Sequence, residues 1–154
     1  MNWLQMSRRL LWLAVLSVMF QTQVLPRPDG CKSATVDKVV KCANVYVELV
    51  GLTSRRLQGR VGNPHKDSLA IVEIYKVGKE ERKSSPSDVV QSHKPYAVIE
   101  TNRDGEFCYP GLPDGYYVIR FGTSGGDLNC SHVKVRILSD SANRKLNVAL
   151  DYGI

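Results

Sequence analysis

Two tight-turn signals within residues 101–122, TNRDGEFCYPGLPDGYYVIRFG, constrain the fold more than any other part of the chain. The first is Asp104-Gly105, which supplies the positive-φ positions that a hairpin turn favours. Phe107 and Tyr109 alternate with other residues directly after it, as expected for a half-buried strand.

The second turn signal, at residues 113–115, combines Pro, Asp and Gly. Tyr117, Ile119 and Phe121 alternate after it. The whole stretch therefore predicts three consecutive antiparallel strands: one that ends at Thr101, one over residues 106–109 and one over residues 116–122.

Other short runs of alternating or β-branched residues predict that the rest of the domain is also all-β. In LAIVEIYK, Ala70, Val72 and Ile74 should face one side of a sheet, while Glu73 and Tyr75 should face the other. Together the runs predict a single seven- to eight-stranded antiparallel, Ig-like β-sandwich. The strand that ends at Thr101 begins at residue 96, and the further expected strands cover residues 45–50, 57–61, 69–76, 133–138 and 145–150.

Two connections have a composition that is typical of loops. Residues 77–95 are polar and contain KEERK and SSPS, so an exposed, mobile loop is expected, with a short helix over residues 79–83 as the alternative. Residues 123–129, TSGGDLN, match no phosphate-binding spacing and are expected to form a flexible strand connection.

Residues 1–25 have the organisation of a secretory signal segment. Arg8 and Arg9 precede an apolar run over residues 10–20, which is shorter than the about 20 residues that a membrane-spanning helix needs. An uncleaved anchor remains the alternative, because no clear cleavage site follows the run. We expect residues 26–56 to form an N-terminal arm and an additional strand, and residues 57–154 to form the sandwich.

The expected location is secreted or periplasmic, and four cysteines fit that location. Loss of the signal segment would lower the net charge from +6 to +4, and the remaining basic residues are scattered, which argues against a nucleic-acid partner. The sequence favours two disulfides, Cys31–Cys42 and Cys108–Cys130, each closing a short loop; free thiols are the alternative. No C-x-x-C spacing suggests a zinc or redox site.

Two blocks of the chain resemble carboxypeptidase regulatory-like domains. Leu57-Gln58-Gly59-Arg60-Val61 followed by residues 69–75 is similar to their G-x-V, turn, A-x-V opening. Residues 101–117, with Thr101, Asp104-Gly105 and Leu112, resemble their T-x-x-D-G-x-F and L-x-x-G-x-Y signature. The resemblance implies a transthyretin-like (prealbumin-like) sandwich that spans about residues 57–150.

Such domains are usually non-catalytic modules of exported or cell-envelope proteins. The resemblance therefore implies a binding or structural module, with an unknown protein or polysaccharide of the envelope as its partner. The membrane would be contacted only through an uncleaved N-terminal segment. The signature residues have structural explanations, so the resemblance brings no catalytic residues with it.

A weak carbohydrate-binding module is the main alternative function. Sugar platforms present exposed aromatic faces, and the chain after residue 25 contains no Trp. Tyr46, Tyr75 and Tyr116 are the residues expected to face outward and to form such a surface.

A transthyretin-like or intradiol-dioxygenase-like enzyme is the less favoured alternative. His65, His93 and His132 are isolated from one another, and the C-terminal sequence Asp-Tyr-Gly-Ile lacks the Tyr-Arg-Gly-Ser ending of 5-hydroxyisourate hydrolases. An intramolecular Lys–Asn crosslink is disfavoured too, because Glu73 and Asn147 should point outward. We therefore expect no catalytic residue, no cofactor and no metal ligand.

Overall fold

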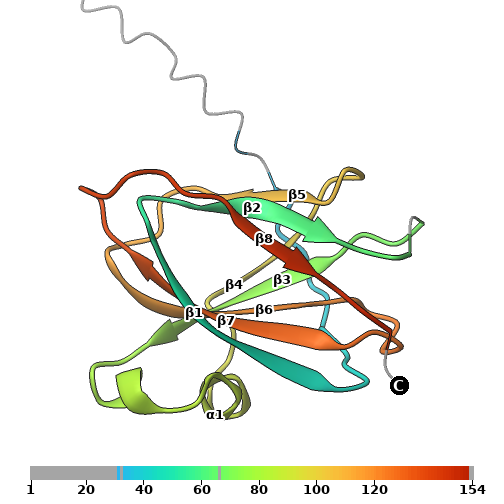
Figure 1. The fold of residues 1–154 in the computed structure, drawn as a ribbon, viewed down its shortest axis with the longest axis horizontal. Coiled ribbons are helices and arrows are strands. Elements are labelled where there is room, and N and C mark those ends of the chain that lie inside the picture. The colour runs from blue at the N-terminus through green and yellow to red at the C-terminus, as the bar shows by residue number, and fades with distance from the viewer. Residues whose placement is uncertain (1–30, 32, 66, 153–154) are drawn as a thin grey trace, which may run out of the picture.

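Two β-sheets face each other in the computed structural model, which describes residues 31, 33–65 and 67–152 (Figure 1). The prediction of an all-β sandwich is confirmed, whereas the expected signal segment, residues 1–25, lies outside the described residues. One sheet has the strand order β1 (Val45–Ser54), β7 (Cys130–Ile137), β6 (Gly115–Gly122), β3 (Ile71–Val77), β4 (Ala97–Glu100). The other has the order β5 (Glu106–Tyr109), β2 (Leu57–Gly62), β8 (Leu146–Ala149).

The strand pairing is mixed, which corrects the expectation of a purely antiparallel sandwich. Strand β1 pairs with β7 in parallel, and β2 pairs with β8 in parallel. The other four pairings are antiparallel, but none of them joins two strands of the stretch 101–122, because β5 pairs with β2 while β6 pairs with β3 and β7. The two predicted turns therefore connect strands of different sheets rather than the arms of hairpins. Alternation and turns predict strands and chain reversals, but they contain no information on which strands pair.

The core lies between the two sheets, and the predicted alternation accounts for it. Val72 and Ile74 are fully buried, and Phe107 of the small sheet packs against Phe121 of the large sheet with ring centroids 5.4 Å apart. The turn at Gly105 has φ +78°, and a Cβ there would lie 2.2 Å from the carbonyl oxygen of Val61. Glycine is therefore required at this turn for two reasons, backbone conformation and close approach.

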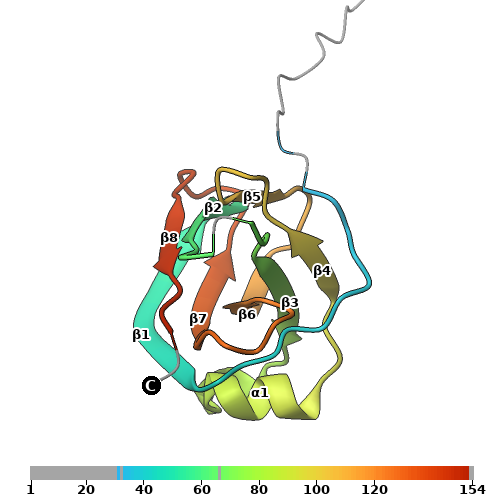
Figure 2. The same cartoon turned by 90° about the vertical axis from the view of Figure 1, so that its right-hand side faces the viewer.

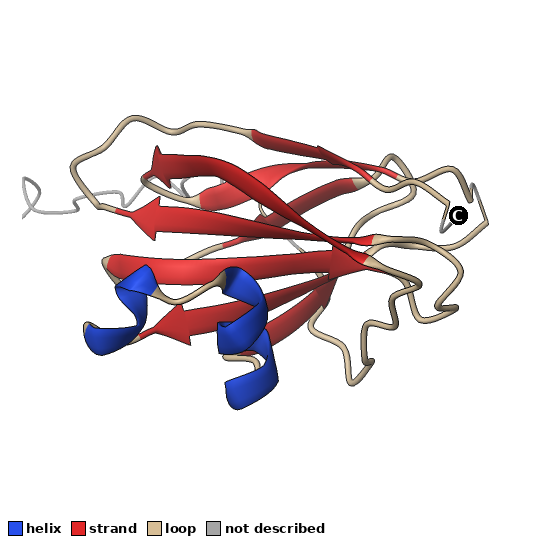
Figure 3. Cartoon of the chain, turned by 60° about the horizontal axis from the view of Figure 1, so that its bottom comes forward, coloured by secondary structure: helices blue, strands red, loops and turns tan. Residues whose placement is uncertain are grey.

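The connection 77–95 is not the mobile loop expected from its composition. It contains a 3-10 helix, η1 (Glu80–Lys83), and an α-helix, α1 (Pro86–Ser92). Figure 3 shows both helices on the outer face of the five-stranded sheet. Ser85 caps α1 by accepting a hydrogen bond from the backbone N–H of Asp88, Pro86 occupies its first turn, and Val89 and Val90 are buried. The SSPS sequence is therefore a helix start rather than a helix breaker.

The N-terminal arm, defined here as residues 31–44, runs along the β4 edge of the sandwich before it reaches β1 (Figure 2). Thr35 forms a bridge with Ile99 of β4, and the backbone N–H of Lys41 donates to the carbonyl of Thr123. The arm is irregular, as predicted, but it is hydrogen-bonded along much of its length.

Both disulfides of the structure join the arm to the sandwich, so the predicted pairing was wrong. Cys31 is bonded to Cys108 of β5, and Cys42 is bonded to Cys130 of β7, while no described cysteine is free. The arm is thereby fixed to both sheets. The sequential pairing fails because the arm extends over the sandwich, which places each cysteine beside a strand that is distant in the sequence.

Candidate ligand-binding site at the loop end

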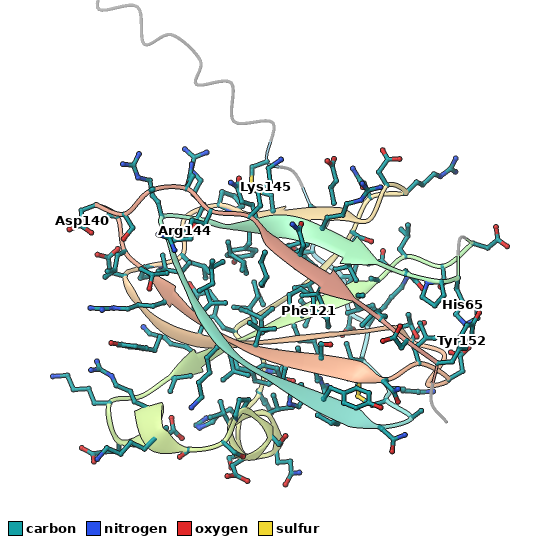
Figure 4. All side chains as sticks on the ribbon, viewed as in Figure 1. His65, Phe121, Asp140, Arg144, Lys145 and Tyr152 are labelled. Atoms are coloured by element: carbon teal, nitrogen blue, oxygen red, sulfur yellow. A yellow bond between two sulfur atoms is a disulfide. The ribbon has the colours of Figure 1, made fainter. Side chains whose placement is uncertain are left out.

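Three loops that carry many polar side chains lie at one end of the sandwich. They are the β2–β3 loop (residues 63–70), the β4–β5 loop (residues 101–105) and the β6–β7 loop (residues 123–129). Figure 4 shows His65 and Tyr152 at this end, while Asp140 lies at the opposite end. Loops that a rigid sandwich holds in place are frequent sites of binding.

His65 and Asp127 join two of these loops. The His65 Nε2 atom lies 2.5 Å from Asp127 Oδ2, although the two residues are 62 positions apart in the sequence. The ring of Tyr152 meets the His65 ring edge-on, with centroids 5.2 Å apart and an interplanar angle of 85°. A hydrogen bond from its own backbone and the one from His65 hold the pKa of Asp127 below its usual range. The carboxylate therefore remains a charged hydrogen-bond acceptor at neutral pH.

A hollow of about 580 Å³ opens beside this pair, and we call it the end hollow. Its size is within the range of small-molecule sites. Carboxylates and hydroxyl groups dominate its wall. Its lining residues are Pro64, His65, Asp67, Ser68, Thr123, Ser124, Gly125 and Asp127.

Thr123 is the most unusual residue of the wall. Its side chain is 3% exposed, and its Oγ1 atom has no hydrogen-bond partner among the described residues. A buried hydroxyl without a partner is costly, and this one lies directly behind the wall of the end hollow. Gly125 leaves the space that this arrangement needs, because a Cβ there would lie 2.9 Å from Asp127 Oδ1.

A second hollow of about 380 Å³ adjoins the end hollow and shares His65 and Ser68 with it. Arg103 and Asn102 lie in its wall. Asn102 also organises the turn below, because its Oδ1 accepts hydrogen bonds from the backbone N–H groups of Asp104, at 3.0 Å, and of Glu106, at 2.8 Å. The two hollows together are lined by residues of all three loops.

The three tyrosines expected to form a binding surface do not share one. Tyr75 is 2% exposed and packs under α1 against Val89 and Val118. Two guanidinium groups lie over the Tyr116 ring, that of Arg82 at 4.3 Å and that of Arg136 at 5.2 Å from its centroid. Tyr75 is therefore buried and Tyr116 partly covered, because α1 and Arg82 of the connection 77–95 pack on this face.

Tyr46 is exposed, at 56%, but it lies on a different face. Tyr46 of β1 pairs with Ser131 of β7, which pairs with Phe121 of β6, so Tyr46 lies on the same side of this sheet as the core residue Phe121. Tyr75 pairs with Val118, which lies two residues from Tyr116 on β6, so Tyr75 and Tyr116 both project from the opposite side. No common sugar platform can include all three tyrosines.

The other two histidines, expected to be isolated, have separate environments that do not converge on the end hollow. His93 pairs with Glu81, and this hydrogen bond lowers the pKa of the Glu81 carboxyl. His132 is buried, and its Nδ1 lies 3.3 Å from Ser87 Oγ on α1. Burial, assisted by the nearby Arg120 charge, lowers the pKa of His132 to about 4.

Glu73 forms the centre of a buried charge cluster under the arm. Its Oε2 accepts hydrogen bonds from Tyr75 Oη at 2.5 Å and from Arg120 Nε at 2.6 Å. Its Oε1 accepts from the backbone N–H of Val40 at 2.8 Å. Burial and the bond to Glu73 raise the pKa of Tyr75. Glu73 does point away from the core, as predicted, but the arm covers it, so the cluster fixes the arm to the sheet.

The end hollow can bind polar groups, and none of its described serine or threonine hydroxyls is hydrogen-bonded to His65. A His–carboxylate pair beside hydroxyl groups is one element of an acyl-transfer site. Among the described residues, however, no hydroxyl group hydrogen-bonds the second ring nitrogen of His65. Within the same residues, no group of three or more His, Cys, Asp or Glu side chains could hold a metal ion. The arrangement is suited to hydrogen bonding with a ligand.

His65, Asp127, Thr123 and Tyr152 were not singled out as a site by sequence reasoning. The sequence predicts that His65 is isolated from the other histidines and that residues 123–129 form a flexible strand connection. The structure instead ties this loop down, since Ala43 donates to the carbonyl of Leu128. Several small polar residues and an Asp in one glycine-rich loop were the only sequence signal, and such a signal does not identify a partner loop.

A scan against protein-family models and searches of curated proteins and of solved structures gave no match for this chain. Within the part of the chain that the structure describes, no helix is long and apolar enough to cross a membrane.

Proposed function

We propose that this protein is an exported, non-catalytic binding module of the cell envelope and that its ligand enters the end hollow. The observation that carries the proposal is the hollow itself, where the His65–Asp127 pair and the side chains of Asp67, Ser68 and Ser124 line one cavity. Rigid strands support the loops around it, so a ligand would meet groups that are already in place.

Two further observations support export and a place in the envelope. Two disulfides are typical of proteins in an oxidising compartment, outside the cytoplasm. The motif resemblance to carboxypeptidase regulatory-like domains and the signal-like residues 1–25 favour the same assignment.

The test is the binding of the purified, disulfide-bonded protein to isolated cell envelopes. Asp127→Ala should reduce the bound fraction about tenfold, because it removes a charged acceptor from the hollow. Asp140→Ala is the matched control, since this exposed carboxylate lies at the far end of the sandwich (Figure 4), and it should leave binding unchanged. Thermal unfolding of both variants confirms that each is folded.

Equal retention of the wild-type protein and of Asp127→Ala would overturn the placement of the ligand in the end hollow. Absence of saturable binding to any envelope fraction would overturn the binding function as a whole.

A further inference from the structure

We propose that the ligand of the end hollow is a neutral oligosaccharide, held by its hydroxyl groups along the two adjoining hollows. This inference rests on the proposed binding function and specifies its ligand class. It follows from the chemistry of the wall, not from the tyrosine surface expected from the sequence.

The donor and acceptor types of the end hollow match a ligand rich in hydroxyl groups. Asp67 and Asp127 offer carboxylate acceptors, and Ser68 and Ser124 offer hydroxyls that both donate and accept. A ligand hydroxyl also donates and accepts, so it can satisfy either kind of group. The hydroxyl of Thr123 has no partner among the described residues, but its Oγ1 atom is fully buried, so the exposed carboxylates and serines provide the contacts to the ligand.

The same groups disfavour other ligand classes. Two carboxylates would repel an anion such as phosphate. A cation would have to compete with His65 for Asp127, and the described residues contain no metal-binding group of three or more side chains. A purely apolar ligand would bury the carboxylates and hydroxyls without giving them partners.

Tyr152 supplies the flat apolar face that a sugar ring needs. Tyr152 is 54% exposed and lies beside the end hollow rather than in its lining, with its ring at 85° to the ring of His65, which lines both hollows. Its backbone is fixed, because the carbonyl of Tyr152 accepts a hydrogen bond from Asn129 Nδ2 at 2.9 Å and Tyr152 bridges Leu128. A sugar can therefore pack its C–H face on Tyr152 while its hydroxyls reach the acidic wall.

The second hollow indicates an oligomer rather than a single sugar. It continues from the end hollow through the shared residues His65 and Ser68, and it presents Asn102 and Arg103 to whatever extends beyond them. The guanidinium group has five N–H donors, and the Asn102 amide retains one besides the one that it donates to Glu106 Oε2, so this wall complements the hydroxyl and ether oxygens of further sugar units.

The test uses the full disulfide-bonded protein on a printed array of neutral and acidic glycans, followed by calorimetric titration with the neutral oligosaccharides that bind, at increasing chain length. Wild-type protein should bind neutral glycans, and affinity should rise with length until both hollows are filled. Asp127→Ala and Tyr152→Ala should each weaken binding about tenfold, through loss of a charged acceptor and of the stacking face.

Two variants separate these roles from general damage. Tyr152→Phe retains the ring and should retain affinity, and Asp140→Ala at the far end should behave as wild type. Arg103→Ala should weaken only the longer oligosaccharides, because Arg103 lines the second hollow alone. Binding should not change when calcium is added or chelated.

If no neutral glycan binds while envelope binding persists and remains sensitive to Asp127→Ala, the saccharide assignment is wrong and the binding function stands. If affinity does not depend on Tyr152 or on chain length, the described mode of binding is wrong. If envelope binding is also absent, the failure lies with the proposed function itself.

Discussion

Arg120 and His132 lie opposite each other on the neighbouring strands β6 and β7, and the imidazole of His132 is only 2% exposed. The Nε2 atom of this ring has no hydrogen-bond partner among the described residues. Protonation would therefore place a second positive charge in a buried site beside a guanidinium group. Glu73 lies one strand further along the same row and partly offsets that charge.

This relationship predicts a loss of stability in mild acid. The pKa of His132 is about 4 in the folded protein and 6.5 for an ordinary histidine, so between these values the unfolded chain binds more protons. Stability should therefore fall as the pH is lowered from about 6.5 to about 4, by roughly 2 kcal/mol. Urea unfolding at a series of pH values measures this loss.

Protonation of carboxylates with lowered pKa values, such as Glu81, also destabilises the folded protein in acid, and this loss must be separated from the effect of His132. His132→Gln provides the comparison, because it removes the titrating group and retains a polar side chain. The wild-type curve should fall more steeply than the variant curve between pH 6.5 and pH 4. Parallel curves would show that His132 does not cause the loss.

Glu73 should be among the residues least tolerant of neutralisation. Glu73→Gln leaves the guanidinium of Arg120 in a largely buried position without its counter-charge, which should cost about 3 kcal/mol of unfolding free energy. Glu81→Gln is the matched control, since the Glu81–His93 pair is exposed to solvent and its loss should cost clearly less. Similar losses for both variants, measured by chemical denaturation, would contradict the assignment of Glu73 as a buried anchor of the arm.

Gly59 should resist substitution because strands β2 and β8 approach each other closely at this residue. A Cβ at Gly59 would lie 1.8 Å from the carbonyl oxygen of Leu146, so Gly59→Ala must displace β8. We expect a loss of about 2 kcal/mol or more.

Gly62 on the same strand provides the control for Gly59. Its nearest neighbours would be 3.7 Å from a Cβ, which is an ordinary contact, so Gly62→Ala should cost much less. Urea denaturation of the two variants gives the comparison, and equal stability would show that the close approach is not required.

Much of the fold could be predicted from local sequence. The turns and alternation of residues 101–122 specify β5, β6 and the inward side chains Phe107 and Tyr117, because these features depend only on neighbours in the chain. Gly59 belongs to the block that resembles carboxypeptidase regulatory-like domains, and the close approach of β8 explains why a glycine is needed at this position. That explanation required the structure, because Leu146 is distant in the sequence.

The site could not be predicted, because it depends on contacts between distant loops. His65 and Asp127 are 62 residues apart, and neither belongs to a recognised spacing. The burial of Tyr75 could not be predicted either, because it depends on packing against α1. The residues that begin this helix, Ser85 and Pro86, are also typical of loops. Local patterns specify which way a strand residue points, but not what covers it.

Disulfide mapping gives a direct test of the arm. Proteolysis without reduction, followed by mass spectrometry, should yield peptides that link Cys31 to Cys108 and Cys42 to Cys130. Removal of the second bond by the paired change Cys42→Ser and Cys130→Ser should cost about 4 kcal/mol, since its 88-residue separation closes a long loop. Recovery of a Cys31–Cys42 peptide would contradict the structure.

The interleaved disulfides also constrain how the chain would mature under the proposed export. Cys31 and Cys42 would then enter the oxidising compartment first, and their correct partners lie 77 and 88 residues further along. An oxidant that joins cysteines in order of arrival would therefore produce the non-native Cys31–Cys42 link. Native maturation then requires thiol–disulfide exchange by an isomerase, so the yield of the protein should depend on that enzyme as well as on the oxidant.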